Sequence, residues 1–371
     1  MKKALVIAYH YPPIRASSNR TFTFTKYMNK YGWEPHVLTV NKPGRGDKGD
    51  YKIKIPENIK VSRTKCINNI LTRAVFKYTK LTISNDYWVP YAVKEGLRII
   101  NEEKINLIYC SIPYESAAVI GYKIWEKTGL PLVIDYRDPW FNEKYNKLQS
   151  KILEKASAII TVNEGTKQEI SKYTDKEINV IYNGIDLEGI EKINVEKNEK
   201  FSIGCASSLF PNYKVKELIE AAKLSGKDIE VHIAGEPYQE LKKYSEGIGL
   251  PVRFYGYLAH QESLEMLAKC HICFLGQDIP TARSGKIFEY MALGKPILAM
   301  APPNSDIETF VKGNKIGSST YDVNKLADHI KAYFDNPNWL EVIAKKCKEL
   351  AKQYDRVELT KQLTQIFDKI T

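Results

Sequence analysis

The stretch SGKIFEYMALGKP at residues 284–296 decides how this chain folds. It predicts a loop, then a short helix with Ser284 as its N-cap. Gly294 predicts the end of that helix, because glycine readily adopts the left-handed conformation that often follows a last turn. Pro296 prevents the helix from continuing, and the apolar run after it predicts a buried strand.

The start of this helix is a candidate anion site. With Ser284 as N-cap, the amides of Gly285, Lys286 and Ile287 would be unpaired. The helix dipole and the Lys286 ammonium would add to their attraction for phosphate. Glu289 lies about 7.5 Å farther along the axis, where it could accept hydrogen bonds from sugar hydroxyls. The alternative is a capped helix with a solvated glutamate.

The run resembles the donor-site signature of the retaining family 4 glycosyltransferases, and most closely the branch that builds bacterial surface polysaccharides. The resemblance implies that Glu289 binds the ribose of a nucleotide-sugar, while residues 284–287 and Arg283 line the donor site. A second glutamate, which touches the transferred sugar in the family, normally stands seven residues before Glu289. Here that position is Ala282, so the sequence leaves open how the sugar is held.

Length and charge set the broad class of protein. The chain has 371 residues, a net charge of +11 and a pI near 9.0. This length suits two domains, and the charge favours an anionic partner such as a nucleotide or a phospholipid surface. The charge is dispersed and no nucleic-acid-binding module is recognisable, so we expect no nucleic-acid partner.

Cysteine usage and apolar runs indicate the compartment. The six cysteines lack the spacing of a disulfide framework, and Cys270 and Cys273 form the only CxxC. We therefore expect buried thiols, no metal site and a reducing cytoplasm. The short apolar run after the first three residues is too short for a signal peptide, and none approaches the about 20 residues of a spanning helix. We expect a cytoplasmic protein whose membrane contact, at the inner face of the cell membrane, would be peripheral.

Two series of alternating strands and helices follow each other along the chain. The first begins with a strand at 4–9, a helix at 19–30 and a strand at 35–40. The second begins with strands at 201–205 and 229–234. Repeated βαβ units predict the α/β class with two doubly wound, Rossmann-like domains.

Domain boundaries follow from composition and from the resemblance. A charged linker near 195–200 predicts a first domain at residues 1–195 and a second at 196–354. The resemblance implies the GT-B fold, in which the first domain binds the acceptor and the second binds the nucleotide-sugar across a cleft. It also implies that the last helix, residues 355–371, returns to the first domain.

The loop after the first strand faces the ligand edge of a doubly wound sheet. Family members usually carry a glycine-rich turn there, and YPPIRASSNR at 11–20 resembles the version in the polysaccharide branch. Ser17 and Ser18 stand in place of glycines, and the resemblance implies that they face the acceptor. Arg15 and Arg20 could meet phosphate, or they could be solvated surface arginines.

The motif DYRDPW at 135–140 also recurs in the polysaccharide branch. An arginine between two acids is either a structural salt bridge or a polar platform for the acceptor. We expect Arg137 to be mainly structural on the acceptor side, and Asp138 to face the site as a candidate catalytic group. His10 ends the first strand, where it could assist the acceptor proton or simply pack.

The loop after the strand at 201–205 ends in Lys214. The family places an arginine early in this loop and a lysine at its end, both on the diphosphate. Lys214 matches the lysine, and the resemblance implies that it shares the leaving-group charge with Lys286. No arginine matches the other position, where Ser207 lies close by. A surface lysine at a helix start is the alternative for Lys214.

Residues 66–81 form a basic amphipathic candidate helix. Its apolar face and flanking lysines and arginines suit a membrane-surface helix. They also suit a helix packed on its own domain.

Taken with the resemblance, these features predict a retaining glycosyltransferase, of the hexosyl or N-acetylhexosaminyl type. It would move a sugar from a nucleoside-diphosphate sugar, which we expect to be UDP-linked, to a saccharide or polyprenyl-diphosphate-linked acceptor. Lysines and a helix dipole would stabilise the leaving diphosphate without a metal cofactor. The alternatives are a GT-B nucleotide-sugar epimerase and a non-catalytic nucleotide-sugar-binding subunit of a glycan assembly complex.

Overall fold

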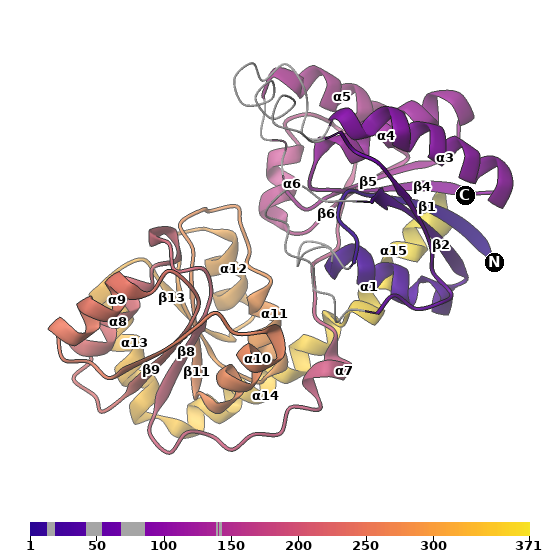
Figure 1. The fold of residues 1–371 in the computed structure, drawn as a ribbon. Coiled ribbons are helices and arrows are strands. Elements are labelled where there is room, and N and C mark those ends of the chain that lie inside the picture. The colour runs from indigo at the N-terminus through magenta and orange to yellow at the C-terminus, as the bar shows by residue number, and fades with distance from the viewer. Residues whose placement is uncertain (13–18, 42–53, 68–85, 139, 141–142) are drawn as a thin grey trace. The chain divides into compact units, whose positions relative to one another are not determined.

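The computed structural model describes the following residues: 1–12, 19–41, 54–67, 86–138, 140 and 143–371. They form two compact units, which are described separately below (Figure 1). Unit 1 comprises residues 1–183 and 356–371, and unit 2 comprises residues 184–355. Each unit is a parallel sheet flanked by helices, which confirms the α/β class with two doubly wound domains.

The chain changes unit at Asn183–Gly184 and again at Asp355–Arg356. The charged segment that predicted a boundary near residue 195 instead belongs to unit 2. The start of unit 2 is tied to its end, because the Ile185 amide donates to the Tyr354 carbonyl oxygen at 2.9 Å.

Unit 1 contains a seven-stranded parallel sheet with the order β3-β2-β1-β4-β5-β6-β7. Its strands are β1 (Lys2–Ala8), β2 (Trp33–Val40), β3 (Lys60–Thr64), β4 (Leu107–Ile112), β5 (Leu132–Tyr136), β6 (Ala158–Thr161) and β7 (Ile178–Val180). Its α-helices are α1 (Asn19–Met28), α3 (Val89–Glu103), α4 (Glu115–Thr128), α5 (Asn146–Lys155), α6 (Glu164–Ile170) and α15 (Arg356–Ile370). The 3-10 helices are η2 (Asn29–Tyr31), η3 (Asp86–Trp88) and η4 (Glu143–Tyr145).

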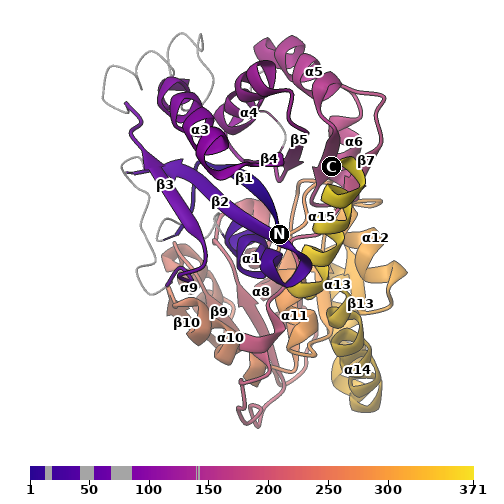
Figure 2. The same cartoon turned by 90° about the vertical axis from the view of Figure 1, so that its right-hand side faces the viewer.

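Both faces of this sheet are buried, as expected for parallel strands between helices. On β1, Leu5 and Ile7 join the core under α3 and α4, while Ala4 and Val6 join the core under α1 and α15. Helices α1 and α15 lie side by side on that second face (Figures 1 and 2). The last helix of the chain is therefore part of the core of unit 1.

Unit 2 contains a six-stranded parallel sheet with the order β10-β9-β8-β11-β12-β13. Its strands are β8 (Ser202–Ala206), β9 (Glu230–Ala234), β10 (Val252–Gly256), β11 (Ile272–Gly276), β12 (Ile297–Met300) and β13 (Gly317–Thr320). Its α-helices are α7 (Leu187–Ile190), α8 (Val215–Leu224), α9 (Gln239–Gly247), α10 (His260–Lys269), α11 (Lys286–Ala292), α12 (Asp306–Gly313), α13 (Val323–Asp335) and α14 (Pro337–Gln353). One 3-10 helix, η5 (Pro211–Tyr213), precedes α8.

The strand orders locate the ligand edge of each sheet. The order reverses between β1 and β4 in unit 1 and between β8 and β11 in unit 2. In open α/β sheets, ligands bind outside the carboxyl ends of the strands at such a switch point. The loops after β1 and β4, and those after β8 and β11, are therefore the places to look for a site.

Candidate active site

Helix α11 begins at Lys286, and its N-cap is Gly285 rather than Ser284. The prediction of a Ser284 cap was therefore wrong. The carbonyl oxygens of Ser284 and Gly285 already accept the amides of Ile287 and Phe288, at 3.3 and 3.1 Å, in tight i to i+3 turns. Of the three amides expected to be unpaired, the Ile287 amide is thus used, and the Lys286 amide lies 3.4 Å from Ser284 Oγ. The Gly285 amide donates no hydrogen bond within the described part of the chain.

The other end of α11 is as predicted. Gly294 adopts the left-handed conformation with φ of +66°. The Lys295 amide then donates to the Tyr290 carbonyl oxygen at 2.8 Å, which is the long bond of a Schellman motif. Both ends of α11 are thus fixed, and the helix holds its side chains at the carboxyl end of β11.

Glu289 lies on the first turn of α11, and its side chain is 15% exposed. Its Oε1 is 3.1 Å from Nε2 of His260, the first residue of α10, and its Oε2 is 3.7 Å from Nζ of Lys286. The carboxylate therefore lies between two basic groups. It remains 15% exposed and can accept further hydrogen bonds.

Lys214 stands at the end of the loop after β8, in the left-handed conformation with φ of +55°. Its Nζ lies 3.0 Å from Asp278 Oδ1 and 3.4 Å from Glu217 Oε1. Burial lowers the pKa of Lys214, but the hydrogen bond that its ammonium donates to Asp278 and the charge of Glu217 outweigh burial and raise the pKa above its ordinary value. The ammonium is therefore charged and directed toward the loop after β11.

A glycine allows the loop that carries Lys214 to approach β11. A Cβ added at Gly276, the last residue of β11, would lie 2.0 Å from the Tyr213 carbonyl oxygen. The Asp278 amide also donates to the Asn212 carbonyl oxygen at 3.1 Å. The loops after β8 and β11 thus pack backbone against backbone, which brings Lys214 to Asp278.

Two other predicted donor residues have internal partners. The Ser207 hydroxyl donates to the Ser208 carbonyl oxygen at 2.9 Å. The Arg283 guanidinium pairs with Asp306 and lies 4.0 Å from the ring centre of Phe310, with only 5% of its side chain exposed. Arg283 therefore links the loop after β11 to α12. Any contact between Arg283 and a nucleotide-sugar would have to compete with that ion pair.

On unit 1, three of the predicted acceptor residues, Arg15, Ser17 and Ser18, lie outside the described residues. His10 is buried, with its ring 5.1 Å from that of Tyr9 and 5.2 Å from that of Tyr114. The structure therefore shows His10 as a packed side chain.

Arg137 and Asp138 follow β5 at the same edge of the sheet. The Arg137 Nε donates to the Ile112 carbonyl oxygen at 2.8 Å, which ties the ends of β4 and β5 together. Burial lowers the pKa of Arg137 to about 10. Asp138 is exposed, and partial desolvation raises the pKa of its carboxyl, opposed by the charge of Arg137.

Arg20 is built into the interior of unit 1. Its Nε and one terminal nitrogen donate to the two carboxylate oxygens of Asp135 at 2.9 and 3.0 Å, and its other terminal nitrogen donates to the Tyr182 carbonyl oxygen at 2.8 Å. The Tyr109 hydroxyl also donates to Asp135. Arg20 therefore does not meet a phosphate in this structure.

Sequence reasoning missed a group of buried polar side chains near the ends of β4 and β5. Glu115, Tyr136 and Gln149 are at most 4% exposed. Among the described residues, Glu115 Oε2, the Tyr136 hydroxyl and both amide atoms of Gln149 are buried and make no hydrogen bond of normal geometry, although Tyr136 and Gln149 lie close enough to interact. Tyr114, just before Glu115, has a positive φ of +77°, which is strained for a non-glycine residue. Polar residues on helices look like solvent-exposed positions in sequence, so only the structure shows this cluster.

The described residues support the predicted state of the cysteines. All six are free, and five of them are buried. In the same part of the chain, no group of His, Cys, Asp and Glu side chains is placed to hold a metal ion. No helix among the described residues has the length and apolar character needed to span a membrane. The basic candidate helix at 66–81 lies mostly outside those residues.

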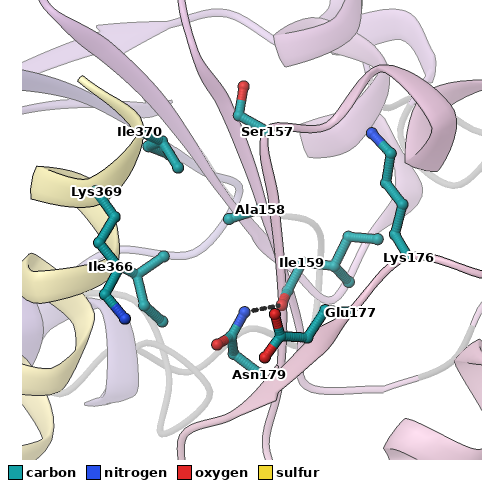
Figure 3. A pocket seen from close by; sticks show the side chains of 9 residues that line it. All are labelled: Ser157, Ala158, Ile159, Lys176, Glu177, Asn179, Ile366, Lys369 and Ile370. Atoms are coloured by element: carbon teal, nitrogen blue, oxygen red, sulfur yellow. Dashed lines mark hydrogen bonds between the residues drawn. The ribbon is translucent and has the colours of Figure 1, made fainter.

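One pocket of unit 1, of about 330 Å³, lies beside the carboxyl end of α15 (Figure 3). Its polar lining residues include Ser157, Lys176 and Asn179, which stand at the amino ends of β6 and β7. Because Asp138 lies at the carboxyl ends of the strands, this pocket is not part of the candidate site.

Family models match nearly the whole chain. A model of glycosyltransferase family 4 matches residues 17–188, and a model of glycosyl transferases group 1 matches residues 188–354. The chain is a family 4 type GT-B glycosyltransferase. A search of curated protein sequences finds no match.

Several solved structures share this fold over the whole length of the chain. Anabaena HepE in complex with UDP and glucose has a TM-score of 0.73 and 18% identity, with 100% of both chains covered. A Rickettsia africae glycosyltransferase has a TM-score of 0.74 and 14% identity, covering 100% of this chain and 98% of that one. A variant of Staphylococcus aureus TarM, in complex with fondaparinux, alpha-GlcNAc-glycerol and UDP, has a TM-score of 0.67 and 14% identity, with 99% and 100% covered. These likenesses confirm the GT-B fold.

Proposed function

We propose that this glycosyltransferase transfers a sugar, with retention of configuration, from a UDP-sugar to a saccharide or polyprenyl-diphosphate-linked acceptor of a surface polysaccharide. HepE and TarM, which share its fold, are described in complexes with UDP. The resemblance of residues 284–296 to the polysaccharide branch supports the class of acceptor. Work on a lipid-linked acceptor would bring the protein to the inner face of the cell membrane.

The observation that carries this proposal is the grouping of two lysines and one carboxylate at the switch point of unit 2. Lys214 follows β8, while Lys286 and Glu289 follow β11, and these two strands are neighbours in the sheet. Two ammonium groups suit a diphosphate, and a carboxylate one turn farther along suits the ribose hydroxyls. A UDP-sugar carries both groups in that order.

Donor binding exchanges charged partners. In the structure, Asp278 and Glu217 orient the Lys214 ammonium, and Lys286 lies beside Glu289. A diphosphate would draw both ammonium groups away from these carboxylates. Glu289 could then accept hydrogen bonds from ribose hydroxyls, with His260 holding its other oxygen.

The reaction needs stabilisation of charge on the leaving group. As the bond between the sugar and the diphosphate breaks, Lys214 and Lys286 take up the developing negative charge. Pre-positioned charges of this kind are often the largest single term in catalysis. In the retaining mechanism that the resemblance implies, the acceptor attacks from the face that the leaving group vacates, so we assign no protein nucleophile.

On unit 1, we propose that Asp138 receives the acceptor. Asp138 is exposed, and its raised pKa suits a group that takes up a proton from an acceptor hydroxyl. His10, Arg137, Arg15, Ser17 and Ser18 complete the proposed acceptor side.

The test is sugar transfer by Glu289→Ala and Lys214→Ala. Removal of one leaving-group contact is expected to lower kcat by about 10²- to 10³-fold, and removal of the ribose contact is expected to raise KM for the UDP-sugar. Glu246→Ala and Lys223→Ala, which change exposed helix residues of unit 2, should leave both constants unchanged. Wild-type constants in both site variants would defeat the assignment.

The same assay separates the alternatives. Product formation from a UDP-sugar without any acceptor would indicate an epimerase. UDP binding without turnover on saccharide and lipid-linked acceptors would indicate a non-catalytic subunit.

A further inference from the structure

A second basic site lies on unit 2 at the carboxyl end of α11, the end opposite Lys286. It is a pocket of about 450 Å³, within the usual size range of small-molecule sites. One wall is the segment from Leu187 to Lys197, and the other is the last part of α14. Ala292 and Leu293 at the end of α11 close it between them. All lining residues belong to unit 2.

The charged residues that line this pocket are mostly positive. Lys197, Lys348, Lys352 and Lys295 line it, and Glu191 is the acidic side chain that lines it. Lys197, Lys348 and Lys352 are exposed, and none of them has a carboxylate partner within ion-pair distance in the described part of the chain.

Lys295 contributes a fixed charge at the wall. It is only 5% exposed, and its Nζ donates to the carbonyl oxygens of Ala268 and Cys270, both at 2.6 Å. Two of its three N–H groups are thus used, and one remains for another acceptor. Burial lowers the pKa of Lys295, and the charges of Lys197 and Lys348 lower it further. The ammonium groups around the pocket therefore repel one another.

Apart from Asn194, the rest of the lining is apolar. Ile190, Ile193 and Val195 face the pocket from one wall, and Ala351 does so from the other. A small inorganic anion would use only the lysines. An anion with a nonpolar neighbouring group would use both parts of the lining.

We propose that this pocket binds a phosphoryl anion, at a site separate from the proposed donor site. Several ammonium groups around one space suit phosphate or diphosphate, which carry more charge and more acceptor oxygens than a carboxylate. The phosphoryl group can come from a free phosphorylated compound or from an anionic lipid headgroup, and the apolar lining suits the nonpolar part of either.

The position of the pocket gives binding a measurable consequence. The Ile185 amide bonds to the Tyr354 carbonyl oxygen, so the two segments where the chain leaves and re-enters unit 1 lie together. The pocket begins two residues after Ile185 and ends two residues before Tyr354. An anion held by Lys197 on one segment and Lys352 on the other would cross-link them and stabilise unit 2.

The test uses inorganic pyrophosphate and a background variant, Lys214→Gln with Lys286→Gln, in which the proposed donor contacts are already removed. Pyrophosphate is expected to raise the Tm of this background protein, since a ligand that binds only the folded state stabilises it. Adding Lys197→Gln, Lys348→Gln and Lys352→Gln should remove most of that rise. Adding Lys345→Gln and Lys346→Gln, exposed residues of α14 that do not line the pocket, should not.

A second arm identifies the source of the phosphoryl group. Flotation with phosphatidylglycerol vesicles, compared with phosphatidylcholine vesicles, reports binding to an anionic headgroup. Binding that depends on Lys197, Lys348 and Lys352 and occurs only to the anionic vesicles indicates a lipid source, and a pyrophosphate response alone indicates a free compound. The proposal is overturned if the background protein responds to neither probe. It is also overturned if the three pocket substitutions leave the response intact, or if the two control substitutions reduce it equally. None of these outcomes depends on whether the donor site transfers sugar.

Discussion

The buried ion pair between Arg20 and Asp135 gives the sharpest stability prediction for unit 1. Their side chains are 3% and 0% exposed, and two hydrogen bonds join them at 2.9 and 3.0 Å. At an effective dielectric constant of about 20, two unit charges about 4 Å apart attract each other by about 4 kcal/mol. Arg20→Met removes this attraction and leaves the Asp135 carboxylate buried, with the Tyr109 hydroxyl as its one remaining side-chain hydrogen-bond donor among the described residues.

We expect Arg20→Met to lower the free energy of unfolding by about 3–5 kcal/mol, the range for breaking a buried pair from one side. Asp135→Asn should cost a similar amount, because it leaves the Arg20 charge buried. The double variant should cost less than the sum of the two, with a coupling of about 1–3 kcal/mol, since neither charge is then left alone. Urea unfolding at fixed temperature and hydrogen exchange of the β5 amides measure these changes.

Lys30→Met, on the exposed 3-10 helix after α1, is the control and should change stability by at most about 0.5 kcal/mol. The reasoning fails if Arg20→Met behaves like this control, or if the two single costs add in the double variant. A rise in KM for a substrate with no loss of stability would instead support Arg20 as a phosphate contact.

Other substitutions test single features of the fold. Gly276→Ala places a Cβ 2.0 Å from a carbonyl oxygen of the loop after β8, so KM for the UDP-sugar should rise. Gly189→Ala is the control, because no atom lies within 4 Å of its added Cβ, and it should leave KM unchanged in the same assay. Phe367→Ala should cost unit 1 about 3–5 kcal/mol in urea unfolding, because its ring, carried by α15, is fully buried against Trp33 and Tyr109. Lys295→Met should cost about 1–3 kcal/mol in the same measurement, because two carbonyl oxygens lose their donor. Burial lowers the pKa of His271 from its ordinary 6.5 to about 4. As the pH falls, the unfolded state therefore binds the proton before the folded state does, and stability should decrease between pH 6.5 and 4. His271→Asn should flatten that part of a pH–stability profile.

The strands that sequence predicted best are those buried on both faces. The strands expected at 4–9, 35–40, 201–205 and 229–234 each lie within a few residues of β1, β2, β8 and β9 as observed. By contrast, β13 has the sequence GSST and was not expected. A Cβ at Gly317 would lie 1.9 Å from the Ile297 carbonyl oxygen, so this strand is defined by close approach to β12 and not by its own side chains.

Helices with narrow apolar faces were missed for a related reason. α5 buries only Gln149, Ile152 and Leu153, and α9 buries only Ser245. Tertiary contacts stabilise such helices, and the 3.6-residue period is too weak to show them in sequence.

The site shows the same division between local and distant information. The spacing of Lys286 and Glu289 is a property of one helix turn, and their 3.7 Å approach follows from it. The partners His260 and Asp278 come from other elements, so no local pattern could predict them. The Ser284 cap failed because the backbone of residues 284–288 had already closed into tight turns, which sequence preference alone does not resolve.

The two units share one arrangement, in which a lysine just before a strand binds the carboxyl end of a helix. In unit 1, Lys176 stands two residues before β7 and donates to the carbonyl oxygens of Glu154 and Ala156 at the end of α5. In unit 2, Lys295 stands two residues before β12 and donates to the carbonyl oxygens at the matching end of α10. A cation at a helix carboxyl end satisfies carbonyl oxygens and the negative end of the dipole together. Lys176 thus joins α5 to β7, and Lys295 joins α10 to β12. Both contacts lie at the amino ends of the strands. The carboxyl edge, where the switch points lie, is left for polar loops and for the chemistry they carry.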